Sequence, residues 1–198
     1  APESDLIVYS DGPKTWGRKS VVSGQKTDYR SQIADYQVQD VREYIQTITG
    51  FKSVRIVERN TNLGLANSII SGVTEVVNQY WKIIDHEDDL VTSPYFLKYK
   101  NDALNLYENE DKVISIHGYV PPIGGLPETF FLKGADCWGW ATWKRGWDLF
   151  EPDGKKLLKE KKEKKLLKRF DFDGAYPYTR MLKDQIEGKN DSWAIRWY

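Results

Sequence analysis

Three adjacent carboxylates, Glu87, Asp88 and Asp89, are the residues of this 198-residue chain whose types and spacing best suit chemistry. They come soon after 81–85, a segment that predicts a buried strand. Neighbouring negative charges repel one another, which destabilises a fold unless a cation or a hydrogen-bond donor compensates. Carboxylate oxygens are hard ligands suited to Mg²⁺ or Mn²⁺, and such ions are often shared with a substrate diphosphate. The alternative is an acidic turn that water solvates.

Between residues 134 and 147 the chain places an aspartate among four tryptophans. Asp136 comes just before Trp138 and Trp140, and two more tryptophans follow. Flat aromatic rings suit the C–H faces of sugars and the faces of nucleobases, so the segment predicts an aromatic platform for a saccharide. A tryptophan-rich packing helix is the alternative.

Two further aspartates stand at predicted element boundaries. Asp11 follows the apolar run 6–9 and precedes a Gly-Pro pair, which indicates a strand that ends in a loop. Asp191 comes just ahead of the apolar and aromatic residues in 193–197, where an aspartate often caps the first turn of a helix. Helix capping is compatible with a second, functional role for Asp191.

The elements that must position these residues alternate between strands and helices. The expected strands are 6–9, 53–58, 81–85, 113–116 and 129–132. The expected helices are 41–48, 65–77 and 94–107, the last with Ser93 as its N-cap and Pro94 at its first position. Such alternation implies an α/β fold with a mostly parallel sheet covered by helices on both faces. Ligands of these sheets bind beyond the carboxyl ends of the strands, where Asp11 and the acidic triplet are expected.

The net charge, the single cysteine and one basic segment indicate which partners and which compartment to expect. The 29 basic and 29 acidic residues cancel, so no net charge draws the chain to nucleic acid. The single cysteine, Cys137, fits a reducing compartment. Residues 155–169 hold nine Lys or Arg and two Glu, a net charge of +7. This segment is either a solvated surface helix or a peripheral contact with an anionic membrane surface.

The stretch 86–96, His-Glu-Asp-Asp-Leu followed by a proline and aromatic residues, resembles the metal-site segment of the GT-A glycosyltransferases. The N-acetylglucosaminyltransferase I type is the most similar within that group. Residues 10–12, Ser-Asp-Gly, look like the second-strand motif of the same enzymes. Residues 60–67 are similar to the Asn-x-Gly-x-x-x-Ala-x-Asn segment of family 2 glycosyltransferases. The resemblance implies a GT-A, Rossmann-like fold for a single catalytic domain over 1–198.

Within that domain the resemblance implies a nucleotide-sugar-binding half, 1–117, and an acceptor-binding half, 118–198. Asp89, together with Asp88, would bind Mn²⁺ or Mg²⁺. Asp88 and Glu87 would hold the ribose and the donor sugar, and Asp11 would approach the uracil ring. Asn67 joins the substrate-binding residues through the segment 60–67.

The resemblance also gives roles to the tryptophan segment and to the last residues of the chain. Residues 134–145 are similar to the floor of the sugar site in family 2 enzymes, which makes Trp138 and Trp140 substrate-binding residues. Residues 190–197 fit the acidic residue and helix that follow this floor. Asp191 would then be the general base of an inverting transfer, with Asp136 as the second candidate.

The sequence therefore predicts a metal-dependent hexosyltransferase that moves a sugar from a nucleotide-diphosphate donor, with UDP the expected nucleotide, to a hydroxyl acceptor. The acceptor is expected to be a saccharide or a lipid-linked saccharide of polysaccharide synthesis. A sugar nucleotidyltransferase is the enzymatic rival, although the Gly-rich basic loop typical of that class is not visible. A non-catalytic nucleotide- or sugar-binding module on the same fold is the other alternative.

Two departures from the family lead us to expect a trimmed piece of a longer enzyme. The first strand–helix unit of the GT-A fold is not visible before residue 6, and the chain stops within the predicted base helix. Activity of this piece alone is therefore open to doubt. The expected location is the cytoplasmic side of a bacterial glycan pathway, with membrane association through 155–169, and a Golgi-lumenal enzyme is the alternative.

Overall fold

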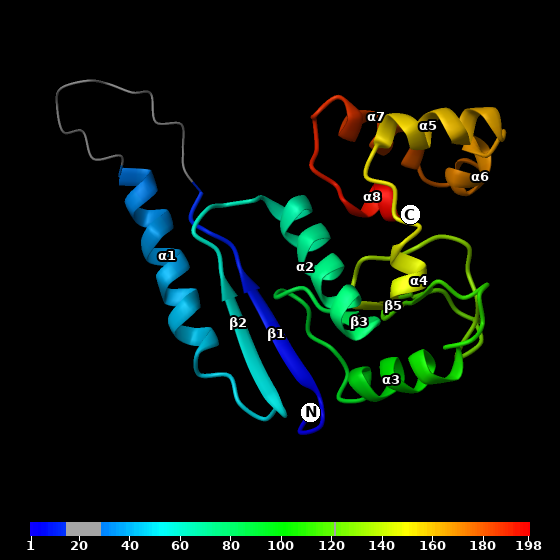
Figure 1. The fold of residues 1–198 in the computed structure, drawn as a ribbon. Coiled ribbons are helices and arrows are strands. Elements are labelled where there is room, and N and C mark those ends of the chain that lie inside the picture. The colour runs from blue at the N-terminus through cyan, green and yellow to red at the C-terminus, as the bar shows by residue number, and fades with distance from the viewer. Residues whose placement is uncertain (15–28, 121) are drawn as a thin grey trace, which may run out of the picture. The chain divides into compact units, whose positions relative to one another are not determined.

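The computed structural model describes residues 1–14, 29–120 and 122–198, which fold into a mixture of helices and short strands (Figure 1). The predicted α/β class is confirmed at this level. The chain forms two compact units, Ala1–Ser68 and Ile69–Tyr198. The functional halves expected from the sequence, 1–117 and 118–198, stay a prediction.

The first unit is built on a parallel strand pair. β1 (Asp5–Ser10) pairs with β2 (Ser53–Glu58) from Asp5 opposite Ser53 to Ser10 opposite Glu58. Parallel neighbours need a crossover connection, and α1 (Tyr29–Ile45) lies in that connection. Both strands agree with the sequence prediction. The helix ends at Ile45, because the amides of Thr47 and Ile48 bond back over three residues in a tighter turn.

The second unit is built on an antiparallel sheet. β5 (Trp140–Trp143) lies between β3 (Lys82–Asp85) and β4 (Ser115–Ile116) and runs antiparallel to both. All four residues of β5 are buried, and Ala141 and Trp143 join a core with Leu104 of α3 (Phe96–Leu106). The predicted mostly parallel sheet is therefore not found among the described residues: β1 and β2 are parallel, and the other three strands are antiparallel. The long helix α2 (Leu65–Tyr80) precedes β3.

Two local predictions are wrong in this unit. Residues 129–132 form no strand, and Phe131 and Leu132 are 71% and 62% exposed, because no neighbouring strand pairs with them. The strand lies instead in the tryptophan segment, at β5. The helix expected from Pro94 begins at Phe96, while the Ser93 hydroxyl accepts a hydrogen bond from the Tyr95 amide at 3.2 Å.

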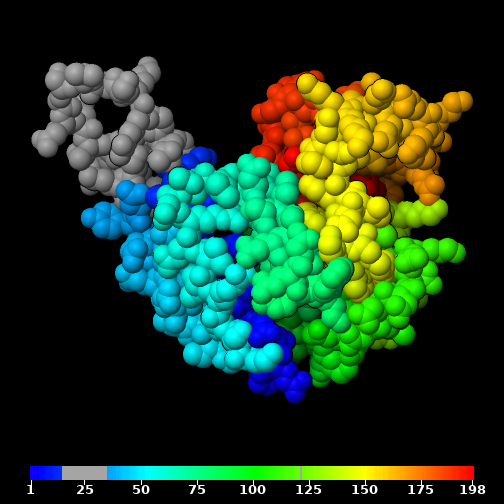
Figure 2. Space-filling view, in the orientation of Figure 1, coloured from blue at the N-terminus to red at the C-terminus, as the bar shows by residue number. Residues whose placement is uncertain are grey.

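Short helices follow β5 and complete the second unit (Figure 1). They are α4 (Lys144–Trp147), α5 (Gly154–Glu163), α6 (Leu167–Phe170), α7 (Tyr178–Ile186) and α8 (Ala194–Trp197), with a 3₁₀ turn at Phe172–Gly174. In Figure 2 these yellow-to-red segments gather together, as expected from their shared core of Phe170, Leu182 and Ile195.

The basic segment forms α5 and part of α6. Leu157 and Leu158 pack against the shared core, so the apolar side of α5 is covered by protein. Several of its lysines pair with glutamates, among them Lys164 with Glu160 at 3.2 Å. This is the arrangement of a surface helix. No helix among the described residues combines the length and apolar character that a membrane crossing needs.

Candidate functional site

The acidic triplet directly follows β3 and is tied to the tryptophan segment. Asp85, the last residue of β3, pairs with Trp140 in the strand register and accepts a hydrogen bond from the Trp140 indole N–H at 2.8 Å. Burial raises the pKa of Asp85, while this hydrogen bond lowers it. The antiparallel pairing thus brings together two motifs that are 55 residues apart in the sequence.

Glu87, Asp88 and Asp89 crowd their charges at this strand end. Burial raises the pKa of Glu87 to about 7, and the charges of Asp85, Asp89 and Asp88 add to the rise. Among the described residues no hydrogen-bond donor or cation pairs with the three side chains. Asp88 and Asp89 are exposed, so both can meet a ligand from solvent. A divalent cation would offset their mutual repulsion.

The donor set of the triplet fits a metal shared with a substrate. In the part of the chain that the structure describes, no three His, Cys, Asp or Glu side chains form a metal cage of their own. Mg²⁺ keeps several waters and takes one or two protein carboxylates together with substrate phosphates. The exposed carboxylates of Asp88 and Asp89 supply that number and type of ligand.

Asp136 orients the tryptophan segment. Its Oδ1 accepts hydrogen bonds from the backbone N–H of Cys137 at 2.8 Å and of Trp138 at 3.4 Å. Its Oδ2 is buried and has no partner among the described residues. The Asp136 charge raises the pKa of Lys100, but burial has the larger effect and lowers that pKa to about 7. The Lys100 ammonium donates to the Ile116 carbonyl at 2.6 Å.

Trp138 and Trp140 have different surroundings although both were predicted to bind substrate. Trp140 is 0% exposed, and its ring centroid lies 5.8, 5.5 and 5.3 Å from those of Trp147, Trp193 and Trp197. Its ring faces are therefore occupied by protein. Trp138 is 52% exposed and keeps a face for a ligand. The sugar platform predicted for Trp138 and Trp140 stays a prediction, and of the two rings that of Trp138 is accessible, because Trp140 is covered by protein.

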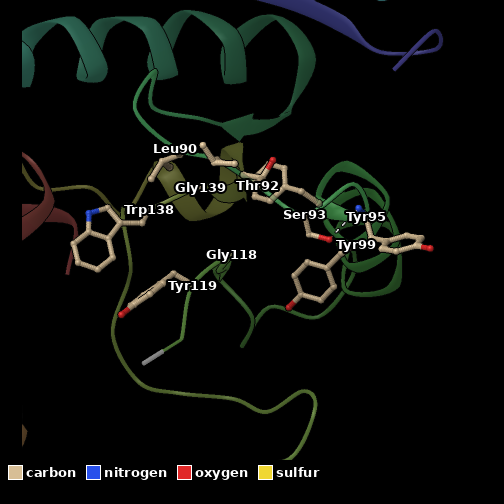
Figure 3. A pocket seen from close by; sticks show the side chains of 11 residues that line it. Leu90, Thr92, Ser93, Tyr95, Tyr99, Gly118, Tyr119, Trp138 and Gly139 are labelled. Atoms are coloured by element: carbon tan, nitrogen blue, oxygen red, sulfur yellow. Dashed lines mark hydrogen bonds between the residues drawn. The ribbon is translucent and has the colours of Figure 1, made fainter. Parts of the chain in front are cut away.

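A cavity of about 480 Å³ lies beside these residues (Figure 3). It is lined by residues between 90 and 99, by 118–119 after β4 and by 138–139 before β5. Gly118 lets these segments approach, because a Cβ there would lie 2.3 Å from the Gly139 carbonyl oxygen. Tyr119 meets Trp138 edge-on, with ring centroids 4.9 Å apart. Figure 3 shows both rings at one end of the cavity and Tyr99 toward the other.

In the first unit, Asp11 joins the two motifs that the sequence assigned to nucleotide binding, 10–12 and 60–67. Its carboxylate accepts hydrogen bonds from the amides of Leu63 at 2.9 Å and Gly64 at 3.1 Å, and from its neighbour Gly12 at 3.1 Å. A Cβ on Gly12 would lie 2.5 Å from the Thr61 carbonyl carbon. Only glycine therefore allows the two loops to approach this closely.

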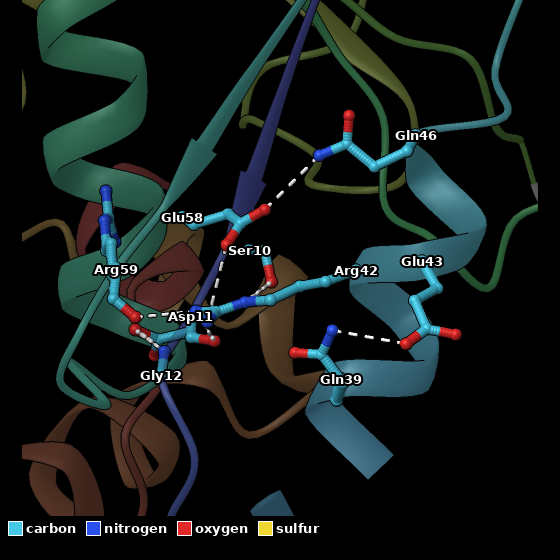
Figure 4. A network of polar contacts seen from close by, with 9 residues as sticks. All are labelled: Ser10, Asp11, Gly12, Gln39, Arg42, Glu43, Gln46, Glu58 and Arg59. Carbon is cyan, nitrogen blue, oxygen red and sulfur yellow. Dashed lines mark hydrogen bonds and ion pairs between the residues drawn. The ribbon is translucent and has the colours of Figure 1, made fainter. Parts of the chain in front are cut away.

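Arg42 fastens the same loops from α1. Its guanidinium donates to the Arg59 carbonyl at 2.7 Å and to the Ser10 hydroxyl at 3.3 Å, and lies 3.6 Å from the Glu58 carboxylate (Figure 4). Asn67, in the first turn of α2, donates to the Leu63 carbonyl at 3.1 Å. These bonds hold the loops in place, and the nucleotide-binding roles of Asp11 and Asn67 stay predictions.

Asp191 lies exposed in the turn before α8. The capping bond that the sequence allowed for Asp191 is made by Ser192, whose hydroxyl accepts from the Ile195 amide at 3.2 Å. Trp193, two residues after Asp191, packs on Trp140 with ring centroids 5.5 Å apart. Trp140 therefore anchors both the Asp191 turn and, through Asp85, the strand that carries the triplet.

Several residues of this site had no sequence signal. The sequence around Tyr95, Tyr99 and Lys100 has the pattern of an ordinary amphipathic helix, which does not distinguish these residues. Tyr119 lies in a segment without periodicity. Only the high number of tyrosines, 12, hinted at such a surface. The chain matches no family model, and neither curated proteins nor solved structures give a match to it.

Proposed function

We propose that this chain carries out metal-dependent, inverting transfer of a sugar from a nucleotide-diphosphate donor, with UDP the expected nucleotide, to a hydroxyl acceptor. The observation that carries the proposal is the exposed carboxylate pair of Asp88 and Asp89, without hydrogen-bond partners among the described residues, directly before Leu90, which lines the same cavity as Trp138. Together they offer a cation site and an aromatic surface on the segments that flank the antiparallel pairing of β3 with β5.

Asp89 and Asp88 are the proposed ligands of Mn²⁺ or Mg²⁺, in keeping with their exposure and their lack of internal partners. A bound divalent ion would neutralise the charge that develops on the leaving diphosphate. Glu87 and Asp88 are proposed to hold the ribose and the donor sugar. Asp11 and Asn67 remain the proposed contacts for the nucleoside.

Asp191 is the proposed general base. In the transfer, the acceptor oxygen forms a bond to the anomeric carbon and loses its proton to Asp191. The bond between the anomeric carbon and the diphosphate oxygen breaks, and the nucleoside diphosphate leaves. A positioned base typically increases the rate of such a step by about 10²- to 10⁴-fold. Asp191 suits this role because it is exposed and the local capping bond belongs to Ser192.

Asp136 is the second candidate for the base. Its Oδ1 is already engaged by the Cys137 and Trp138 amides, so deprotonating an acceptor would fall to the buried Oδ2. This makes a positioning role more compatible with its surroundings. Saccharides or lipid-linked saccharides remain the proposed acceptors, with peripheral membrane contact through the exposed lysines of 155–169.

The test of this function measures binding and turnover separately. Thermal unfolding should be recorded with UDP in Mn²⁺ and with UDP in EDTA, alongside UDP release from a UDP-sugar without acceptor. A stabilisation that needs Mn²⁺, together with slow UDP release, is the expected result. Equal stabilisation by UDP in EDTA would remove the metal role. Binding of UDP without any turnover would instead favour a non-catalytic module on the same fold.

A further inference from the structure

We infer that the cavity bordered by Leu90, Gly118 and Trp138 is the subsite for an uncharged sugar ring of the acceptor. The inference rests on the sugar transfer proposed above and assigns the acceptor to a place distinct from the carboxylates. The cavity belongs entirely to the second unit. Figure 3 shows its aromatic side chains arranged around an open centre.

The chemistry of the cavity wall selects a neutral ligand. Every residue that lines it is uncharged, so it offers no cation to a diphosphate and no carboxylate to a metal. Its volume of about 480 Å³ falls in the usual range of small-molecule sites, roughly 300–1,000 Å³. A nucleotide diphosphate therefore has little to bind here, whereas a neutral ring with hydroxyl groups is well matched.

Polar groups on the wall suit the hydroxyls of a sugar. The hydroxyls of Thr92, Tyr95, Tyr99 and Tyr119 have no hydrogen-bond partner within the described parts of the chain. A hydroxyl both donates and accepts, as sugar hydroxyls do. Tyr95 is 74% exposed and Tyr99 44%, so their hydroxyls can be reached from solvent.

Trp138 supplies the apolar surface on which a ring can stack. Tyr119 packs against it at an interplanar angle of 76°, which fixes the indole by one edge-on contact. An aromatic face carries negative charge density, and the C–H groups on one face of a pyranose carry a small positive charge. Stacking of a sugar on the free indole face is thus favourable, and Asp136 holds the Trp138 backbone in position for it.

The location of the cavity points to the acceptor rather than to the donor. Leu90 immediately follows Asp89, and Trp138 comes two residues after Asp136, so a ring in the cavity lies next to the proposed reaction centre. The donor sugar follows its diphosphate and the metal to Glu87 and Asp88. The cavity, whose wall has no carboxylate, is therefore the place for the acceptor sugar.

Saturation-transfer NMR on the 198-residue chain tests the inference with defined probes. The neutral probes are the methyl glycosides of glucose, mannose, galactose and N-acetylglucosamine, and methyl glucuronide is the anionic counterpart. At least one neutral glycoside should bind, and it should bind at least about fivefold more tightly than methyl glucuronide, because the wall has no cation for a carboxylate.

Variants place the binding in the cavity. Trp138→Ala and, independently, Tyr119→Ala should weaken binding of the neutral glycoside by about tenfold, the loss expected for an aromatic contact. Trp138→Phe should retain part of it, because a smaller ring can still stack. Trp81→Ala is the matched control: Trp81 is 68% exposed in the same unit but does not line the cavity, so this variant should bind normally.

The outcomes separate the cavity from the transfer reaction. UDP release from a UDP-sugar with no glycoside binding would overturn the acceptor subsite and leave the proposed function standing. Glycoside binding that survives both Trp138→Ala and Tyr119→Ala would place the sugar elsewhere and also overturn the inference. Glycoside binding through Trp138 without any UDP binding would leave a sugar site but overturn its role as an acceptor subsite.

Discussion

Asp11 and the triplet Glu87–Asp89 both follow a strand, and both belong to motifs that stand out in the sequence. Their surroundings are opposite. The Asp11 carboxylate accepts hydrogen bonds from three backbone amides and thereby fixes the loop around Leu63. The triplet has no such donors among the described residues, and crowding helps to raise the pKa of Glu87 to about 7. An acidic motif that its own fold leaves uncompensated is the stronger candidate for binding a cation or a substrate.

The same contrast separates Asp136 from Asp191. Asp136 is engaged by the amides of Cys137 and Trp138 and lies near the Lys100 charge. Asp191 is exposed, and Ser192 provides the local capping bond in its place. Asp11 and Asp136 thus resemble each other in accepting hydrogen bonds from backbone amides, whereas the side chains of Asp191 and the triplet have no hydrogen-bond partner among the described residues.

The largest effect that this contrast predicts is on turnover. Asp191→Asn should lower kcat by roughly 10²-fold or more, because an amide cannot take the proton of the acceptor hydroxyl. Donor binding should hardly change, since the lost interaction belongs to the transition state. Steady-state kinetics of UDP release with a saccharide acceptor measures both quantities.

Asp136→Asn is the matched variant for that experiment. It should reduce kcat less than Asp191→Asn, because its main contacts are with backbone amides. Near-normal turnover in Asp191→Asn together with loss of turnover in Asp136→Asn would reverse the contrast. The base would then belong to the tryptophan segment.

The next largest effect concerns the metal. UDP at 100 times its Kd should stabilise the chain by about 2.7 kcal/mol in Mn²⁺. Asp89→Asn should remove the Mn²⁺-dependent part of this stabilisation without destabilising the chain in the absence of UDP. Asp111→Asn is the control, since Asp111 is also exposed but lies away from β3 in the sequence. Full Mn²⁺-dependent stabilisation in Asp89→Asn would exclude Asp89 as a ligand.

In the absence of ligand, we expect a variant at Asp11 in the first unit to lose stability and a variant of the triplet to lose none. Asp11→Ala should lower the free energy of unfolding by about 1–3 kcal/mol, because the Leu63 and Gly64 amides lose their acceptor. Asp88→Ala should not destabilise the chain and should relieve part of the repulsion around Glu87. Urea unfolding of both variants in EDTA measures the difference, and equal losses would remove the contrast between the two motifs.

The smallest effect is a pH dependence from Lys100. Burial lowers its folded-state pKa to about 7 from the usual 10.5, so between these values the unfolded chain holds a proton that the folded chain lacks. Raising the pH therefore stabilises the folded state, by about 1 kcal/mol between pH 7.5 and 8.5. Urea unfolding at the two pH values should show this gain in the wild type and not in Lys100→Met.

Lys98→Met is the control for the pH effect, because Lys98 lies on the same helix but is largely exposed and paired with Asp102. It should keep the full dependence on pH. A Lys100→Met variant that gains as much stability as the wild type would show that another group titrates in this range.

Sequence patterns predicted the elements whose local signal agrees with their packing. Residues 53–58 alternate in polarity and form β2 with the predicted bounds, and the apolar stripe of 65–77 lies within α2. β5 was missed because all four of its residues are buried, which removes the alternation that marks a half-exposed strand. Conversely, 129–132 has strand-forming residues but no partner strand, and tertiary context decides such cases.

The candidate site also contains residues with a local sequence signal and features that depend on tertiary structure. The triplet, Asp136 and Trp138 could be found in the sequence because each motif is local. The pairing of Asp85 with Trp140 could not, since it depends on an antiparallel register between segments 55 residues apart. Nor could the burial of Trp140, because a tryptophan in the core and one at a ligand site look alike in a single sequence.

The tryptophan cluster around Trp140 gives the second unit an optical signature of its own. Of the eight tryptophans in the chain, only Trp16 precedes Ile69. The ring centroids of Trp140 and Trp147 lie 5.3 to 6.4 Å from each other and from those of Trp193 and Trp197. Electronic transitions of indoles at such spacing couple as excitons and produce paired circular-dichroism bands that vanish when the rings separate. Loss of these bands therefore reports the unfolding of residues 69–198, and it can be measured separately from the unfolding of residues 1–68.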